Sequence, residues 1–274
     1  MAAARMLGFL LLTLPLVPPY WILLRAHRLE ACRVIARLYW RATLRIIGVR
    51  VVIRGRICDE TPVLFVSNHS SYLDIAVIGA LLKACFVAKQ EVRGWAGLGF
   101  LSRLARTVFI DRQPRESRRQ RDVMTRRLIE VGDSLVLFPE GTTSDGNRVL
   151  PFKSSLFSVA ENPLANGLPP IVQPVSITYT RLDGLPIGRT WRPFFAWYGN
   201  MELAPHLWVL LGLGVITAEV TLHPPVRVDR FGGRKALSEH CWQVVAEGVT
   251  AANQGRAGAE AEAPATPPAD VAVG

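Results

Sequence analysis

The chain has 274 residues, of which 50% are hydrophobic, and its mean hydropathy of +0.23 is apolar for a protein of this size. Its formal net charge is +10, mostly from arginine, so we expect an anionic partner such as phospholipid head groups, nucleic acid or an acidic carrier protein. The four cysteines, Cys32, Cys58, Cys85 and Cys241, are scattered and form no C-x-x-C pair, which argues against a zinc site or a disulfide framework and favours a reducing compartment.

The N-terminus begins with an apolar run over residues 6–24, which contains Pro15, Pro18 and Pro19. A membrane-spanning helix needs about 20 apolar residues, so the run has the length of a minimal span. The prolines favour a kinked, half-inserted or hairpin anchor over one straight helix. A cleaved signal peptide is the alternative, but no clear A-x-A-like site follows and the next residues are arginines.

Arginines dominate the stretch that follows the apolar run. Arg33, Arg37, Arg41 and Arg45 recur at every fourth position and Glu30 is the one acid between residues 25 and 56, which predicts an amphipathic basic helix at the membrane interface. The excess of arginine places this side of the anchor in the cytoplasm. We therefore predict a membrane anchor and basic helix over 1–48, a folded domain over 49–250 and a disordered tail over 251–274.

Short apolar strands alternate with helical stretches from residue 49 onward. This pattern predicts an α/β fold with a single mixed sheet covered by helices, preceded by the N-terminal membrane-associated helical segment. The predicted strands lie at 62–66, 84–89, 107–112, 134–138, 170–177 and 215–222. The predicted helices lie at 75–82, 95–105, 115–131, 152–161, 207–213 and 235–249.

The junction between the first of these strands and its helix, Ser67 to Asp74, holds a histidine and an aspartate five residues apart. In a continuous helix they would lie on different sides, but a turn followed by one helical turn could fold the imidazole of His69 back onto Asp74. Such a pair makes His69 a general base and needs a nucleophile from the substrate, such as a hydroxyl group. The alternative is a helix cap with a half-buried histidine.

Two further strand ends carry polar residues, at Asp111-Arg112 and at Glu140 to Ser144. Sites in open α/β sheets gather at the carboxyl ends of strands, so these ends and the His69 junction are expected to converge. Gly141 would let backbone N–H groups approach a polar head group closely. Arg112 could bind a phosphate or carboxylate through two hydrogen bonds, or could pair with Asp111 within its strand.

Four segments together resemble the ordered motifs of the glycerolipid acyltransferases, over roughly residues 45 to 225. They are Asn68-His69-(four residues)-Asp74, Phe109-Ile110-Asp111-Arg112, Phe138-Pro139-Glu140-Gly141-Thr142 and Val172-Gln173-Pro174-Val175. The typical member is a 1-acyl-sn-glycerol-3-phosphate O-acyltransferase.

The resemblance implies an enzyme that moves an acyl chain from a thioester of acyl carrier protein or coenzyme A to a lysolipid hydroxyl, at the cytoplasmic face of the inner membrane. It makes His69 the general base and Asp74 its orienting partner. The acceptor head group would be bound by Lys89, Arg112, Glu140, Gly141 and Thr142, and the strand of Pro174 would help to form the acyl-donor side. It implies no bound cofactor, no metal and no nucleic acid.

One position departs from the family pattern. Arginine usually follows Glu-Gly-Thr in this family, whereas this chain has Thr143. Threonine cannot neutralise a phosphate, so the acceptor is either 1-acyl-sn-glycerol-3-phosphate bound with one partner fewer, which we favour from the sequence, or another lysolipid such as lyso-ornithine lipid.

Functions of other classes are less well supported. A serine hydrolase would need a G-x-S-x-G motif, which is absent, and Gly212-x-Gly214 lacks the third glycine of a dinucleotide-binding fingerprint. Nucleic-acid binding would explain the charge but not the apolar N-terminus. A non-catalytic membrane-binding scaffold would keep the anchor and the arginines without any need for His69 and Asp74.

Overall fold

The structure is a computed structural model that describes residues 1–95, 97–110 and 122–256. Its strands are β1 (Val49–Gly55), β2 (Val63–Ser67), β3 (Cys85–Lys89), β4 (Val108–Ile110), β5 (Leu135–Leu137), β6 (Ile171–Leu182), β7 (Leu185–Pro186) and β8 (Ile216–Leu222). Its α-helices are α1 (Ala2–Arg25), α2 (Leu29–Ile47), α3 (Leu73–Leu81), α4 (Leu98–Leu104), α6 (Leu203–Gly212) and α7 (Arg234–Asn253). Short 3-10 helices lie at η1 (Gln90–Gly94), η4 (Ser154–Glu161), η5 (Arg192–Phe194) and η6 (Val228–Arg230), and a π-helical turn at η3 (Arg126–Glu130).

Within the described residues, the strands form one sheet in the order β1-β8-β6-β2-β5-β3-β4, with β7 paired to β6. β6 runs antiparallel to β8 and to β7, and every other pair of neighbours is parallel. The prediction of a single mixed sheet is therefore confirmed. Because β2, β5 and β3 are consecutive and parallel, the residues that follow them leave the sheet at the same edge.

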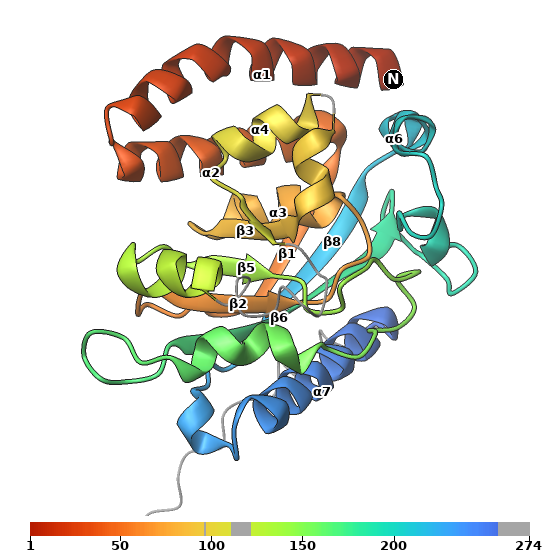
Figure 1. Cartoon of the computed structure of the whole chain (residues 1–274). Helices are drawn as coiled ribbons and strands as arrows, with labels where there is room; N and C mark the ends of the chain where they lie inside the picture. Colours follow the sequence, from red (N-terminus) through yellow and green to blue (C-terminus); the bar gives the residue numbers. More distant parts are fainter. Residues whose placement is uncertain (96, 111–121, 257–274) are drawn as a thin grey trace, which may run out of the picture.

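Helices cover both faces of the sheet (Figure 1). Helices α1 to α4 lie on one side, while η4 and α7 lie on the other. Strand β2 shows why its sequence is apolar throughout. Val63 and Phe65 belong to the core beside α2 and α3, and Leu64 and Val66 belong to the core beside η4 and α7. A strand buried on both faces needs a continuous apolar run rather than an alternating one.

The N-terminal run forms one helix, α1, which contains all three of its prolines. The run does not fold back on itself as a hairpin at the prolines, and α1 arches over α2, to which a short turn connects it (Figure 1). Among the described residues, α1 is the helix long and apolar enough to cross a membrane, judged by length and composition. Its Arg5 donates hydrogen bonds to the carbonyls of Leu213, at 2.6 Å, and Gly214, at 3.3 Å, which ties α1 to the end of α6.

Helix α2 lies between α1 and α3, so its arginines are not all available to a membrane. Arg33 pairs with the buried Asp133 at 2.8 Å, and Arg41 donates to the carbonyl of Ala80 at 3.1 Å. The prediction of an interfacial arginine stripe is therefore corrected for Arg33, which pairs with a buried carboxylate, whereas Arg41 stays exposed. Packing against α3 is close, because a Cβ on Gly79 would lie 3.0 Å from the Cγ atom of Trp40.

Some elements differ from their predicted limits. Helix α7 ends at Asn253 rather than near 250, because two alanines extend it and Ala252 is buried against the core. Residues 154–161 form a 3-10 helix, and the described part of the predicted helix 115–131 ends in a π turn. Residues 111–121 and 257–274, which include Asp111, Arg112 and most of the predicted tail, lie outside the described residues.

Candidate active site

His69 and Asp74 contact each other at the junction between β2 and α3. The residues between them form a turn, and Asp74 lies in the first turn of α3. His69 Nδ1 lies 2.8 Å from Asp74 Oδ2, so the predicted pairing of the two side chains is confirmed. The histidine side chain is 20% exposed and the aspartate is fully buried. Because a carboxylate only accepts hydrogen bonds, Nδ1 carries the proton and Nε2 is the ring nitrogen left to accept one.

The Asp74 carboxylate is held by three more donors. The backbone N–H groups of Ser70 and Ser71 donate to Oδ2 at 2.8 and 3.0 Å, and the Tyr179 hydroxyl donates to Oδ1 at 2.6 Å. Tyr179 comes from β6, and burial, together with the Asp74 charge, raises its pKa, so the hydroxyl keeps its proton. Asp74 therefore has a single orientation, and so does the imidazole that it holds.

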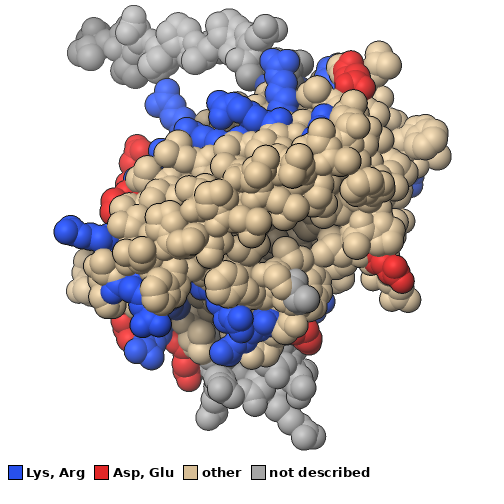
Figure 2. Space-filling view, turned by 90° about the horizontal axis from the view of Figure 1, so that it is seen from above, with Lys and Arg blue, Asp and Glu red and all other residues tan. Residues whose placement is uncertain are grey.

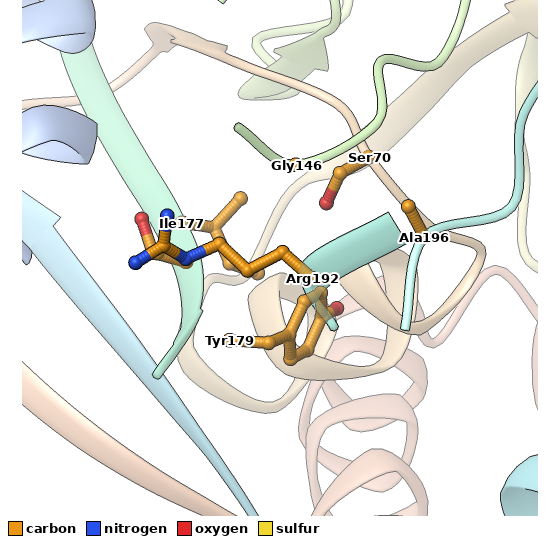
Figure 3. Close-up of a pocket in the computed structure, with 7 residues that line it drawn as sticks. Ser70, Gly146, Ile177, Tyr179, Arg192 and Ala196 are labelled. Carbon is orange, nitrogen blue, oxygen red and sulfur yellow. The ribbon is translucent and has the colours of Figure 1, made fainter. Parts of the chain in front are cut away.

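The cavity behind this network is too small for a substrate. Ser70, Tyr179 and Arg192 are among the residues that line it, and its volume is about 10 Å³, which suits one water molecule (Figure 3). A substrate must therefore reach His69 from the side that is open to solvent.

The loop after β5 holds His69 from another side. Glu140 Oε1 accepts a hydrogen bond from the backbone N–H of His69 at 2.6 Å, and the N–H of Ser144 donates to the His69 carbonyl at 2.9 Å. The Phe138 ring stacks on the imidazole, with centroids 4.1 Å apart. This loop and the His69 junction, expected to converge, do lie together.

The Glu140 side chain is better placed to hold the backbone than to bind a ligand. The residue is only 3% exposed, and its second oxygen accepts the N–H of Leu150 at 2.8 Å. The resemblance assigned Glu140 to the acceptor head group. Since both oxygens already bind backbone donors, its geometry fits a positioning role for His69 better than direct contact with a head group.

Burial also makes Glu140 sensitive to pH. Burial raises the pKa of Glu140 to about 8, against an ordinary value of 4.5. The nearby Asp74 charge adds to this increase, whereas the hydrogen bonds from the two backbone N–H groups oppose it. A carboxyl with a raised pKa in the folded state stabilises the fold most below its unfolded pKa, and this contribution is lost as the pH rises through the folded pKa. One such group can change the free energy of unfolding by about 1.4 kcal/mol per pH unit.

We therefore expect the unfolding temperature of the full chain in detergent to fall between about pH 5 and pH 8 more steeply for wild type than for Glu140→Gln, which does not titrate. The amide should lower stability at every pH because it cannot accept both N–H groups, so the comparison concerns slopes and not levels. Parallel curves for the two proteins would contradict the shifted pKa.

The other predicted site residues are near the site where the structure describes them. Gly141 and Thr142 lie in the Glu140 loop, Gly141 buried with φ of 78° and Thr142 exposed. Lys89 is the last residue of β3 and is half-buried at the same edge of the sheet, two strands from β2. Arg112 lies outside the described residues. Among those that are described, no group of three or more His, Cys, Asp or Glu side chains is arranged to hold a metal ion.

Two buried amide side chains fasten β6 to its surroundings in ways that the sequence does not reveal. The Asn68 amide bonds both the N–H and the carbonyl of Ile177, at 2.8 and 2.9 Å, which extends the pairing of β2 with β6 by one residue. At the start of α3, the Ser71 hydroxyl accepts the N–H of Leu73 at 3.4 Å, and Asp74 accepts the N–H groups of Ser70 and Ser71. Gln173, beside Pro174, is fully buried and bonds the backbone of Arg56, Cys58 and His223.

Comparison with known proteins places the chain in a family. Residues 48–178 match the family model Acyltransferase. A lyso-ornithine lipid O-acyltransferase of Brucella abortus is 42% identical over 83% of this chain and 85% of its own length. A 1-acyl-sn-glycerol-3-phosphate acyltransferase of Neisseria gonorrhoeae is 34% identical over 73% of this chain and 76% of its own.

A similar fold occurs in the crystal structure of the 1-acyl-sn-glycerophosphate acyltransferase of Thermotoga maritima. It has 22% sequence identity and a TM-score of 0.55, and the match covers 82% of each chain. The sequence relatives extend over most of both chains at 42% and 34% identity, and the described motif residues His69, Asp74 and Glu140 lie together at one edge of the sheet. The protein therefore belongs to the acyltransferase family and is an O-acyltransferase.

Proposed function

We propose that this acyltransferase moves a fatty acyl chain from an acyl thioester to the hydroxyl of lyso-ornithine lipid. The observation that carries the reaction type is the His69–Asp74 pair, in which Asp74 holds the imidazole of His69 so that its Nε2 can accept a proton. The hydroxyl that attacks the thioester then comes from the acceptor lipid.

The proposed chemistry uses His69 twice. Its Nε2 removes the proton from the acceptor hydroxyl as the oxygen attacks the thioester carbonyl, and Asp74 stabilises the imidazolium that forms. The tetrahedral intermediate then collapses, the carbon–sulfur bond breaks, and the imidazolium returns the proton to the departing thiolate. The products are an ester and the free thiol of acyl carrier protein or coenzyme A, and His69 is neutral again.

Two observations favour lyso-ornithine lipid over 1-acyl-sn-glycerol-3-phosphate, the acceptor that we favoured from the sequence. The relative named for lyso-ornithine lipid is more similar to this chain than the one named for the phosphate acceptor, with 42% against 34% identity. Thr143 also fits, because an acceptor without a phosphomonoester has less need of an arginine at this position.

We also propose that the protein works on the cytoplasmic face of the inner membrane, with α1 inserted into the lipid. The helix exposes large apolar side chains, at Leu7, Leu10, Leu11, Leu14, Trp21 and Ile22. Seen from the α1 side, the protein shows a broad uncharged face with many lysine and arginine side chains and fewer acidic ones around its edge (Figure 2). Such a face suits a lipid bilayer, and its basic edge suits anionic head groups.

The test offers the purified full chain in detergent a panel of lysolipids with acyl carrier protein and coenzyme A thioesters, and identifies the products by mass spectrometry. We expect the acylated ornithine lipid to form faster than phosphatidic acid, and His69→Ala to form product about 10²–10⁴-fold more slowly than wild type. Phosphatidic acid as the sole product would contradict the proposed acceptor. Equal product from His69→Ala and wild type would contradict the proposed base.

A further inference from the structure

The side chain of Lys153 lies directly over Gly141, in the loop that holds His69. A Cβ atom added to Gly141 would lie 2.8 Å from Lys153 Cε and 3.2 Å from its Cδ, with Nζ nearer still. These separations are shorter than carbon–carbon contacts in proteins, so the lysine fills the space that any larger residue at 141 would need. The Lys153 side chain is thus a second reason why glycine is needed at position 141, in addition to its φ of 78°.

The backbone places this lysine firmly beside the site. The N–H of Lys153 donates to the carbonyl of Pro139 at 2.9 Å, and the Lys153 carbonyl accepts from Leu156 at the start of η4. Three residues earlier, the N–H of Leu150 donates to Glu140 at 2.8 Å. Residues 150–153 are therefore fastened to residues 139–140, and Glu140 in turn holds the backbone of His69.

The ammonium group of Lys153 pairs with no carboxylate among the described residues. Lys153 is exposed, and none of the ion pairs or side-chain hydrogen bonds formed by the described residues involves it. Glu140 is next to Gly141 in sequence, but both of its oxygens accept backbone N–H groups. Thr142 and Thr143 carry no charge. Lys153 thus leaves a positive charge at the solvent side of the Glu140 loop.

We propose that Lys153 binds the anionic group of the acceptor lipid, the carboxylate of an ornithine head group or the phosphate of a phospholipid one. The inference rests on the proposed function, because it names a residue that recognises the acceptor of that reaction. It follows the chain of contacts from His69 through Glu140 and Gly141 to Lys153, which puts the charge on the loop that holds the general base. An acceptor held there brings its hydroxyl to Nε2 of His69.

The first test is Lys153→Gln in the full chain in detergent, with steady-state kinetics on lyso-ornithine lipid. Because the variant loses a hydrogen bond between charged groups, we expect the KM for the acceptor to rise roughly tenfold to a hundredfold. The kcat and the KM for the thioester should change by less than about twofold. Lys235→Gln is the matched control, because Lys235 is exposed at the start of α7, outside the Glu140 loop, and should change neither constant. An unchanged acceptor KM in Lys153→Gln, or a rise in the thioester KM instead, would overturn the proposal.

The second test changes the lipid, so it remains informative if Lys153→Gln folds poorly. The methyl ester of lyso-ornithine lipid lacks the carboxylate charge, and we expect wild type to bind it roughly tenfold to a hundredfold more weakly than the free acid. Lys153→Gln should bind the two lipids alike. Thr143→Arg in the Lys153→Gln background should restore preference for the charged lipid, because it returns a cation to the same loop. Equal KM values of wild type for acid and ester would refute an ionic contact.

The two proposals fail in different ways. If wild type acylates 1-acyl-sn-glycerol-3-phosphate but not lyso-ornithine lipid, the proposed acceptor is wrong, and the same variants then test Lys153 against the phosphate. If wild type acylates lyso-ornithine lipid and Lys153→Gln has the same acceptor KM, the acceptor stands and the role of Lys153 is wrong.

Discussion

Replacing His69 by alanine should lower kcat by about 10²–10⁴-fold, the usual contribution of a positioned general base. The loss should appear with both thioester donors, because the proton removed belongs to the acceptor hydroxyl. Folding should be unaffected, since the imidazole is partly exposed and Asp74 keeps the Ser70, Ser71 and Tyr179 donors. The measurements are initial rates of product formation and the unfolding temperature in detergent. Wild-type activity in the variant would remove His69 from the mechanism.

Two further substitutions separate the base from its support. Asp74→Asn should also lower kcat strongly, because an amide can donate to Nδ1 and so stabilise the tautomer with its proton on Nε2. Tyr179→Phe removes one hydrogen bond and keeps the ring, and about a tenfold loss in kcat is expected. If Tyr179→Phe were as damaging as His69→Ala, the hydroxyl would have a larger role than positioning Asp74.

Replacing Asp133 by alanine should destabilise the fold by about 3 kcal/mol, near the lower end for breaking a buried charge pair. Asp133 is 1% exposed and binds three arginines from separate segments, Arg33 at 2.8 Å, Arg106 at 2.6 Å and Arg127 at 2.9 Å. Without the carboxylate, three guanidinium groups repel one another. Water reaches part of each arginine, which is why we expect the lower value.

Glu30→Gln is the control for Asp133→Ala. Glu30 also pairs with Arg33, at 3.2 Å, but its side chain is 60% exposed, so its loss should change the unfolding free energy by less than about 1 kcal/mol. The measurement is denaturant unfolding of the full chain in detergent. Equal effects of the two substitutions would show that burial does not strengthen the contribution of Asp133.

The local pattern of the sequence predicts much of the fold. The apolar run at Val63 to Val66 indicates a strand buried on both faces, and the His69–Asp74 spacing after it indicates a turn that brings the two side chains together. Both features depend on neighbours within a few residues. The strand order is different, because nothing in the runs at 171–182 and 216–222 reveals that these strands are antiparallel in an otherwise parallel sheet.

The residues that support the site were missed for the same reason. Tyr179 lies 105 residues from Asp74, and no spacing pattern connects them. Asp133 reads as an ordinary loop residue until the fold brings Arg33 and Arg106 to it. Lys153 follows the Glu-Gly-Thr motif by eleven positions, and its position over Gly141 depends on the backbone of the intervening turn. Motif residues can be recognised one by one, whereas these contacts exist only in the folded chain.

The hairpin of α1 and α2 has a consequence for how the enzyme can be divided. Leu44 and Ile47 belong to the same core as the apolar side chains of α3 and β8, and the Trp40 ring lies against Gly79. The segment that we propose to bind the membrane is thus no detachable module joined by a linker. Removal of residues 1–48 would uncover interior surface instead of liberating a soluble catalyst, and an anchor from another protein could not simply be fused at this point. The proposed lipid surface and the His69–Asp74 site are parts of one packed unit.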